Sequence, residues 1–309
     1  MAAKATLDVN GKKLAVTNLD KVFYPQTGFT KGEVIDYYVR ISPVLLPHLQ
    51  RRPISLKRYP DGVEGIFFYE KQCPAHRPGW MKTARVPKSE GGAIDYCLIN
   101  DLPALVWAAN MADLELHTFL HKAPALQRPT VLAFDLDPGP PADILTACQV
   151  GLMLRKLFDS LGMESFPKTS GSKGLQVYVP LNRPVTYEKT KPFAHAVAQL
   201  LESQSPGKIV SVMSKSLRKG KVFIDWSQND EKKTTVSVYS LRAKDRPTVS
   251  TPVTWKEVEA AVRQKKPLSF DSVAVLRRVE KQGDLFAPVL TLQQKLPTLA
   301  LLQHDSPAH

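Results

Sequence analysis

The sequence predicts an α+β fold whose chemically reactive side chains lie at the ends of strands. Short apolar runs with strand-like alternation are interspersed with longer segments of helical periodicity. The 25 prolines outnumber the 16 glycines and divide the chain with many turns. Hydrophobic residues make up 43% and charged residues 23%, as in globular proteins. Because 309 residues suffice for a large core, we expect one domain or two closely associated lobes.

The first part of the chain is predicted to form strands around a long helix. Residues 6–9 and 13–17 flank an Asn-Gly turn and read as a hairpin. Thr30 and Glu33 have the spacing of a capping box, and apolar residues recur after them at helical intervals. Further strands are expected at 54–58, 66–70 and 114–120.

From Val131 onward, strands and helices alternate. Residues 131–134 form a short apolar strand that leads into Asp135-Leu136-Asp137, and a helix at 142–161 follows a proline-rich break. The tail after Gly283 is expected to wrap around the body. The remaining elements are strands at 175–179, 222–224 and 234–239, and helices at 188–203 and from Thr254.

The charge balance indicates a polyanionic partner. Forty-two basic and 29 acidic residues give a net charge of +13, which favours nucleic acid or an acidic membrane surface. No apolar run of 18 residues and no apolar signal core are present, which argues against membrane spanning and secretion. Three scattered cysteines, Cys73, Cys97 and Cys148, are typical of reduced thiols in a cytoplasm.

Three aspartates at strand ends predict a metal site. Asp135 and Asp137 point to the same side because side chains alternate along a strand, and Asp225 follows a second strand. Carboxylates that face one another repel unless a cation lies between them, and Mg²⁺ and Mn²⁺ take such oxygen ligands. Solvated loop carboxylates are one alternative. A haloacid-dehalogenase-type phosphatase is another, although Pro138 and Gly139 stand where that family usually has Gly and Thr.

The segment 168–176, KTSGSKGLQ, joins two predicted strands with small residues and lysine. Such a turn brings backbone N–H groups, hydroxyls and a cation onto a phosphate. It lacks the spacing of a Walker loop, and a plain Gly/Ser turn is the alternative. Beside three carboxylates in a basic protein, the segment predicts triphosphate binding.

Many short blocks occur in a characteristic order. They lie at 16–25, 30–32, 52–58, 67–68, 115–117, 134–139, 169–174, 223–229 and 239–243. With these blocks the chain resembles the polymerase domain of bacterial ATP-dependent DNA ligase D, a member of the archaeo-eukaryotic primase superfamily. Since the K-x-D-G motif of a ligase nucleophile is absent from the sequence, it resembles the stand-alone Prim-Pol C forms.

The resemblance implies a single primase-polymerase domain over 1–309. Its catalytic core, an RRM-like mixed sheet with flanking helices, is expected at about 111–283. An N-terminal α/β module at about 1–110 would bind DNA and its 5′-phosphate, and residues 284–309 would form a C-terminal tail.

The resemblance also implies roles for individual residues. Asp135, Asp137 and Asp225 would be the catalytic residues and hold two metal ions, and Arg218 lies in a mobile loop before the third of them. Lys21 and Lys31 would bind a DNA 5′-phosphate. Without the resemblance, a packed histidine, core aromatics and surface lysines would be equally ordinary interpretations. The residues expected to bind the nucleotide are Lys57, Phe67, Phe68, His117, Ser170, Ser172, Lys173, Gln176, Gln228 and Arg242.

One position departs from the family pattern. Gln176 stands where the family usually has a histidine. Glutamine donates hydrogen bonds but carries no charge, so replacing it with histidine is expected to lower the KM for nucleotide.

The function implied is a template-dependent DNA/RNA polymerase that fills short 5′-phosphorylated gaps in end joining or excision repair. This nucleotidyltransferase would use two Mn²⁺ or Mg²⁺ ions, prefer ribonucleotides and release pyrophosphate. Expected partners are gapped or broken double-stranded DNA, NTPs and dNTPs, Ku and a separate ATP-dependent DNA ligase. We expect a monomer in the bacterial cytoplasm, near the nucleoid. A non-catalytic DNA-end-binding module and a D-x-D phosphatase remain alternatives.

Overall fold

The structure, a computed structural model, describes residues 4–88 and 90–303. The chain folds into two compact units, each assembled from separate stretches of sequence. Unit 1 contains Met1–Pro124, Thr234–Ser250 and Phe270–Asp284, and unit 2 contains Ala125–Lys233, Thr251–Ser269 and Leu285–His309. Segments 111–124 and 234–250, which we expected in the catalytic core, therefore group with the N-terminal module.

A six-stranded sheet organises unit 1. Strand β5 (Pro53–Arg58) pairs with β9 along one edge, while β8 and β6 share its other edge. The segment 234–250 joins unit 1 because β15 pairs with β9. The strand order is β15 (Thr235–Val236), β9 (Asp113–Thr118), β5, β8 (Ala93–Leu98) and β7 (Thr83–Pro87), with β6 (Phe68–Glu70) beside β5.

The long helix of unit 1 begins where the capping box predicts. In α1 (Lys31–Leu49), the Thr30 hydroxyl accepts from the Glu33 N–H at 3.2 Å, and the Glu33 carboxylate accepts from the Thr30 N–H at 2.7 Å. The helix packs against α2 (Leu102–Asn110) and α6 (Ser272–Gln282). Two small hairpins precede it, β1 (Lys4–Val9) with β2 (Lys12–Thr17), and β3 (Val22–Tyr24) with β4 (Phe29–Thr30).

A five-stranded sheet organises unit 2, with β10 (Val131–Pro138) at its centre. Leu132, Phe134 and Leu136 of β10 are fully buried, whereas Asp135 and Asp137 are half-buried. Because side chains alternate, the leucine and phenylalanine side chains share one face and the aspartates the other. The order is β11 (Phe166–Thr169), β12 (Leu175–Pro180), β10, β14 (Val222–Asp225) and β13 (Ile209–Val210).

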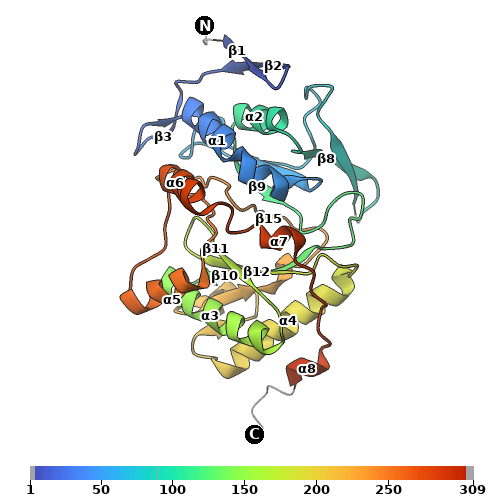
Figure 1. Ribbon diagram of the computed structural model, residues 1–309, viewed down its shortest axis with the longest axis vertical. Coiled ribbons are helices and arrows are strands. Elements are labelled where there is room, and N and C mark those ends of the chain that lie inside the picture. Colours follow the sequence, from blue (N-terminus) through green and yellow to red (C-terminus); the bar gives the residue numbers. More distant parts are fainter. Residues whose placement is uncertain (1–3, 89, 304–309) are drawn as a thin grey trace. The chain divides into compact units, whose positions relative to one another are not determined.

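Helices cover the apolar face of this sheet. Helix α3 (Ile144–Ser160) packs on β10 and β12, and α4 (Tyr187–Gln204) packs beside it on the same side (Figure 1). A Cβ on Gly151 of α3 would lie 2.7 Å from Leu175, so glycine permits the close packing of helix on sheet. The shorter elements are η1 (Lys215–Arg218), η2 (Trp226–Gln228), α5 (Trp255–Gln264), α7 (Pro288–Thr291) and α8 (Ala300–Gln303).

Two predicted strands differ from the structure. The strand that begins at Val131 continues through both aspartates to Pro138, because β12 and β14 pair with it on either side. The strand expected at 234–239 is reduced to Thr235–Val236, since Tyr239 adopts a left-handed conformation with φ of 62°.

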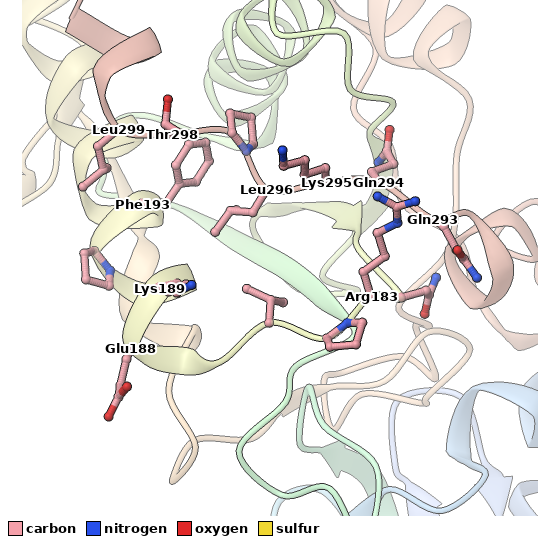
Figure 2. A pocket seen from close by; sticks show the side chains of 15 residues that line it. Arg183, Glu188, Lys189, Phe193, Gln293, Gln294, Lys295, Leu296, Thr298 and Leu299 are labelled. Carbon is pink, nitrogen blue, oxygen red and sulfur yellow. The ribbon is translucent and has the colours of Figure 1, made fainter.

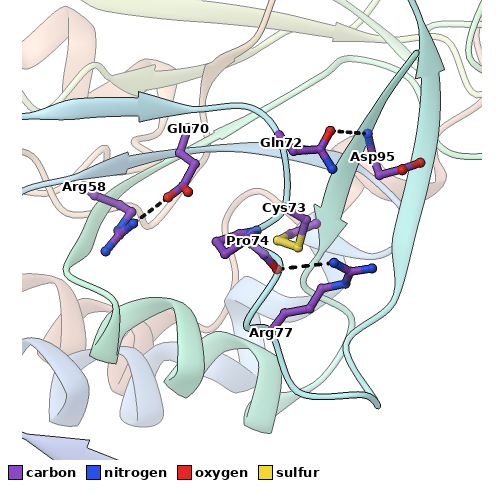
Figure 3. The surroundings of a disulfide bond; sticks show 8 residues. Arg58, Glu70, Gln72, Cys73, Pro74, Arg77 and Asp95 are labelled. Carbon is purple, nitrogen blue, oxygen red and sulfur yellow. Dashed lines mark hydrogen bonds and ion pairs between the residues drawn. A yellow bond between two sulfur atoms is a disulfide. The ribbon is translucent and has the colours of Figure 1, made fainter. Parts of the chain in front are cut away.

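The cysteine prediction is wrong for two of the three residues. Cys73 and Cys97 form a disulfide, which joins the segment after β6 to β8 (Figure 3). The Cys73 N–H also donates to the Asp95 carbonyl at 2.7 Å. Cys148 is buried and unbonded. No helix in the described part of the chain is both long and apolar enough to span a bilayer.

Candidate active site

The sheet of unit 2 brings the three predicted aspartates together. Asp135 and Asp225 are direct cross-strand neighbours in the β10–β14 register, and Asp137 lies two positions further along β10. Directly opposed residues have Cβ atoms about 4.5–5.5 Å apart. All three carboxylates therefore emerge from the face of the sheet that α3 and α4 leave uncovered.

Burial and mutual repulsion raise the pKa of Asp135 to about 7. Burial is the largest cause and the neighbouring Asp137 charge the next, and Asp225 acts in the same direction. A hydrogen bond with Gln176 and the charge of Lys168 oppose the rise. Without a counter-ion, burial together with repulsion between the carboxylates thus favours a proton on Asp135 near neutral pH.

Hydrogen bonds fix the orientation of Asp225. Its Oδ1 accepts from the Ser227 N–H at 3.0 Å and hydroxyl at 2.5 Å, and its Oδ2 accepts from Gln228 Nε2 at 2.8 Å. Buried Asn229 ties η2 to β10, because its side-chain amide exchanges hydrogen bonds with both the N–H and the C=O of Ala133. Gln228, predicted as a nucleotide contact, thus also orients a carboxylate.

The predicted phosphate-binding turn closes on itself. The Ser170 hydroxyl accepts from the N–H groups of Ser172 and Gly174 at 3.2 and 3.1 Å. A Cβ on Gly174 would lie 2.3 Å from the Leu136 carbonyl, so only glycine lets the turn approach β10. Ser172 and Lys173 are exposed at its tip. Ser170 shapes the turn, and its neighbours are available to a ligand.

Buried Lys168 supplies a positive charge beside Gln176. Lys168 is fully buried on β11, and its ammonium donates to Gln176 Oε1. That bond orients the Gln176 amide so that its NH₂ group is the donor toward Asp135. Glutamine carries no charge at this position, but the ammonium of its cross-strand neighbour Lys168 supplies one beside it. The sequence contained Lys168 in the turn motif, but its inward direction is set by the register Lys168↔Gln176.

A loop carrying Arg218 lies against the D-x-D strand. A Cβ on Gly139 would lie 2.0 Å from the Arg218 carbonyl, and the Gly139 N–H donates to Lys221 O at 2.8 Å. The Arg218 guanidinium stacks over the Phe223 ring, 3.8 Å from its centroid. Phe223 is paired with Asp137, so the guanidinium is held on the carboxylate face.

In unit 1, the carboxylate of Glu115 contacts three of the predicted nucleotide-binding residues. Its Oε2 lies 3.0 Å from His117 Nε2, 3.3 Å from Lys57 Nζ and 3.4 Å from Arg242 Nε, and its Oε1 accepts from the Ala243 N–H. Burial acts to raise the pKa of Glu115, but His117, Arg242 and Lys57 together hold it below its usual value. Burial also lowers the pKa of His117. A neutral His117 therefore donates through Nε2 to an ionised carboxylate.

Three aromatic rings surround Lys57, and two of them are exposed. Its ammonium lies 4.8 Å from the Phe67 centroid, 5.2 Å from that of Tyr59 and 5.5 Å from that of Tyr69. Phe67 and Tyr69 are 49% and 56% exposed, which suits them for stacking with a base. Phe68 pairs with Arg58, on the face of the sheet opposite Lys57. The predicted Phe67-Phe68 pair is thus divided, and Tyr69 lies with Phe67.

Tyrosine hydroxyls hold the segment that carries Arg242. Tyr24 donates to the Arg242 carbonyl at 3.0 Å, and Tyr37 donates to the Tyr239 carbonyl at 2.8 Å. Tyr38 donates to Leu114 O and accepts from the Leu241 N–H. These bonds join α1, β9 and the 239–242 segment, so the position of Arg242 depends on three buried side chains far from it in sequence.

Lys21 and Lys31, the residues predicted to bind a 5′-phosphate, line one small pocket. It has a volume of about 160 Å³ and also contains Arg58. Lys31 is 5% exposed and donates to the Thr17 carbonyl at 2.7 Å. Burial and the charge of Lys21 lower the pKa of Lys31 to about 8. Figure 3 shows Arg58 ion-paired with Glu70, at 2.6 Å.

Comparison with known proteins identifies the family. The family model for the LigD primase-polymerase domain matches residues 30–286. This chain belongs to the LigD primase-polymerase domain family. It is 42% identical over 284 residues to the multifunctional non-homologous end joining protein LigD of Mycolicibacterium smegmatis, a match that covers 90% of this chain and 36% of that protein. The bifunctional non-homologous end joining protein LigD of Bacillus subtilis is 32% identical over 291 residues, 94% of this chain and 46% of that protein.

A solved LigD structure has the same fold. The polymerase domain from Mycobacterium tuberculosis ligase D, in complex with DNA, matches with a TM-score of 0.85 and 38% identity, covering 91% of this chain and 99% of that one. The predicted α+β, primase-like fold is confirmed. As a LigD primase-polymerase domain, the chain is a nucleotidyltransferase. It spans about a third of the length of the mycobacterial LigD proteins.

Sequence reasoning missed Glu115, Tyr69 and the role of Lys168. Glu115 and His117 are two residues apart on a strand, and Tyr69 is two residues after Phe67, so alternation placed each beside a predicted site residue. That spacing was the available signal. Lys168 gave none, because nothing in the sequence distinguishes a buried lysine from an exposed one.

Proposed function

We propose that the chain extends a primer 3′-end opposite a short, 5′-phosphorylated gap in double-stranded DNA, with ribonucleotides preferred. The observation that supports this most directly is the set of three carboxylates on one sheet face beside a hydroxyl- and lysine-bearing turn. Such a face fits a polyphosphate and its metal ions. Ku and a separate ATP-dependent ligase are the partners we infer, and the chain acts as a monomer in the bacterial cytoplasm.

The donor chemistry fits Mn²⁺ or Mg²⁺. Asp135, Asp137 and Asp225 present only oxygen atoms, and their mutual repulsion would be relieved by divalent cations. No group of three or more His, Cys, Asp or Glu side chains among the described residues is arranged closely enough to hold an ion ready-made. When bound, the two ions lower the pKa of the primer hydroxyl and neutralise the triphosphate.

The chain's own residues have distinct roles in this proposal. Ser170 shapes the turn, and Ser172 and Lys173 at its exposed tip contact the triphosphate. Lys168 orients Gln176, and Gln228 with Ser227 orients Asp225. In unit 1, Phe67 and Tyr69 provide ring faces for the base, while Lys57, His117 and Arg242, held by Glu115, contact the nucleotide. Phe68, on the opposite face of the sheet, is not assigned a contact, and Arg218 belongs to the loop that precedes Asp225.

One assay distinguishes the proposed function from its alternatives. A 5′-phosphorylated gapped duplex is incubated with Mn²⁺ and labelled NTPs or dNTPs, in parallel with a phosphomonoester. We expect template-directed extension and no hydrolysis of the monoester. DNA binding without incorporation would instead identify an end-binding module, and release of phosphate without template or nucleotide would identify a phosphatase.

The pKa of Lys31 predicts that recognition of the 5′-phosphate weakens at alkaline pH. Since the pKa is about 8, Lys31 loses its charge as the pH rises through that value. A phosphate dianion favours the ammonium form, so binding above pH 8 takes up a proton. We expect the preference for a 5′-phosphate over a 5′-hydroxyl end to fall about tenfold between pH 7 and 9, measured by fluorescence anisotropy of labelled duplexes.

The double variant Lys21→Gln, Lys31→Gln tests the same pocket, with exposed Lys13→Gln as its control. Glutamine is preferable to a charge reversal because Lys31 is buried and faces the Thr17 carbonyl. The double variant should bind both ends equally at every pH, and Lys13→Gln should behave as wild type. A wild-type preference that does not vary with pH would contradict the role of Lys31.

Removing the buried charge of Lys168 should weaken metal binding. In Lys168→Met, Asp135 loses a charge that lowers its pKa, and Gln176 loses the donor that fixes its amide. A rise of one pKa unit reduces Mn²⁺ affinity at pH 7 by about fivefold, measured by calorimetry without nucleotide. Gln176→His should change the KM for nucleotide by less than about twofold, because a ring nitrogen facing the Lys168 ammonium stays unprotonated. A strongly lowered KM would show that this position lacks charge.

A further inference from the structure

A second cavity lies in unit 2, beside the N-terminal half of helix α4. It has a volume of about 980 Å³, near the upper end of the range for ligand pockets. The loop after β12, the first turns of α4 and the segment 293–299 enclose it (Figure 2). None of the residues assigned above to catalysis, nucleotide or 5′-phosphate lines it.

Hydrogen bonds and packing hold both ends of segment 295–299 beside α4. The cavity between them is therefore a fixed feature of the fold. Before this segment, the Gln294 side chain donates to the carbonyls of Glu164 and Pro180 at 3.0 and 2.9 Å and accepts from the Glu164 N–H. Asn182 donates to two carbonyls of the preceding turn. After it, α8 packs on α4, with Leu302 4% exposed. Because segment 295–299 is held at both ends, it does not need to pack against α4 itself to keep its position.

The lining combines apolar surface with unpaired positive charge. Arg183, Lys189 and Lys295 make no ion pair with any described residue, and all three are exposed. Glu188 is the only carboxylate among the lining residues, and Figure 2 shows it pointing away from the cavity. The apolar part comes from Pro184, Val185, Pro192, Phe193, Leu296, Pro297 and Leu299.

We propose that this cavity is a docking site for a short acidic peptide of a partner protein, whose aliphatic side chains enter between α4 and segment 295–299. Three cations against one outward-directed carboxylate select a negatively charged ligand. Buried apolar surface supplies the affinity that charges on an open surface do not.

A peptide fits the lining better than nucleic acid does. Single strands bind non-specifically by stacking bases on exposed aromatic rings. Phe193 is the only aromatic residue that lines the cavity, and it is 1% exposed, so it offers no ring face. Prolines and aliphatic side chains complement an aliphatic anchor, and the surrounding cations complement flanking carboxylates.

The test uses the full chain and a fluorescein-labelled peptide in which leucine alternates with aspartate. We expect saturable binding by anisotropy, and a dissociation constant raised about tenfold or more by the double variant Arg183→Glu, Lys295→Glu. Lys156→Glu, an exposed lysine on α3 outside the cavity, is the matched control and should bind as wild type. Leu296→Ser should weaken binding without changing the charge.

Two further probes, a serine-containing peptide and a single-stranded oligonucleotide, distinguish the proposed ligand from other ligands. A peptide with serine in place of leucine should bind at least about tenfold more weakly. Circular dichroism and extension of a gapped primer verify that the variants are folded. The proposal is overturned if the leucine peptide does not bind, if the serine peptide binds equally well, or if the charge variants have no effect. It is also overturned if a single-stranded oligonucleotide binds with the same dependence on Arg183 and Lys295.

Discussion

Replacing Asp137 with alanine should abolish primer extension while leaving DNA binding nearly intact. Asp137 shares the sheet face opposite α3 and α4 with Asp135 and Asp225, and its removal takes away one of the three oxygen donors proposed for the metal ions. We expect the extension rate to fall on the order of 10³-fold or more. Gel-based extension of a gapped primer measures the rate, and anisotropy of the same duplex measures binding.

The control for Asp137→Ala is Asp159→Ala, an exposed aspartate of α3 in the same unit. It should retain wild-type extension. Removing Asp137 also relieves repulsion within the carboxylate cluster, because its charge raises the pKa of Asp135. The metal-free variant should therefore be at least as stable as wild type above pH 7. Extension at the wild-type rate would show that the aspartates hold no catalytic metal.

Replacing Glu115 with alanine should damage both stability and nucleotide binding. The side chain is 2% exposed and is the common partner of Lys57, His117 and Arg242. Its removal leaves the Lys57 and Arg242 cations without a counter-charge and His117 without its acceptor. Breaking a buried ion pair in this way costs about 3–5 kcal/mol of unfolding free energy. We also expect the KM for nucleotide to rise about tenfold, since three contacts lose their common anchor. Urea unfolding and steady-state extension measure the two effects.

The loss of stability in Glu115→Ala should depend on pH, because the pKa of Glu115 is lowered in the folded protein. A carboxyl whose pKa is lower in the folded state contributes stability that is complete above its ordinary value of 4.5 and disappears as the pH falls below it. The difference between wild type and Glu115→Ala should therefore shrink in acid. Exposed Glu64→Ala is the control and should cost less than about 0.5 kcal/mol. A Glu115→Ala protein with wild-type stability at pH 7 would contradict the central role of this carboxylate.

Local patterns in the sequence were sufficient wherever the physical cause is local. The capping boxes at Thr30 and Thr254 begin helices at those residues, and the Asn-Gly turn joins β1 to β2. Alternation placed Asp135 and Asp137 on one face before any strand partner was known. The D-x-D strand itself was predicted too short, because its last four residues include two aspartates and a proline and are held as a strand only by β12 and β14.

Pairings between distant segments required the tertiary structure. The 234–250 segment joins the N-terminal unit through β9, and tyrosines of β3 and α1 hold the segment that carries Arg242. Neither the strand pairing nor the tyrosine hydrogen bonds produce a periodic pattern in the sequence, because both depend on which surfaces meet in the folded chain. Cys73 and Cys97 are 24 residues apart and their Cα atoms lie 5.0 Å from each other only because β8 returns beside the segment that follows β6.

The sequence by itself determined the family and predicted the acidic residues, the phosphate-binding turn and the lysine pair, since each is carried by residue types at short spacings. Tertiary structure decided how those groups are held and charged. Lys168 places a positive charge beside Gln176, Glu115 contacts two cations and a neutral histidine, and Phe68 turns away from Phe67. The physical reason is that pKa values, hydrogen-bond partners and exposure depend on burial and on neighbours across strands, which spacing along the chain does not specify.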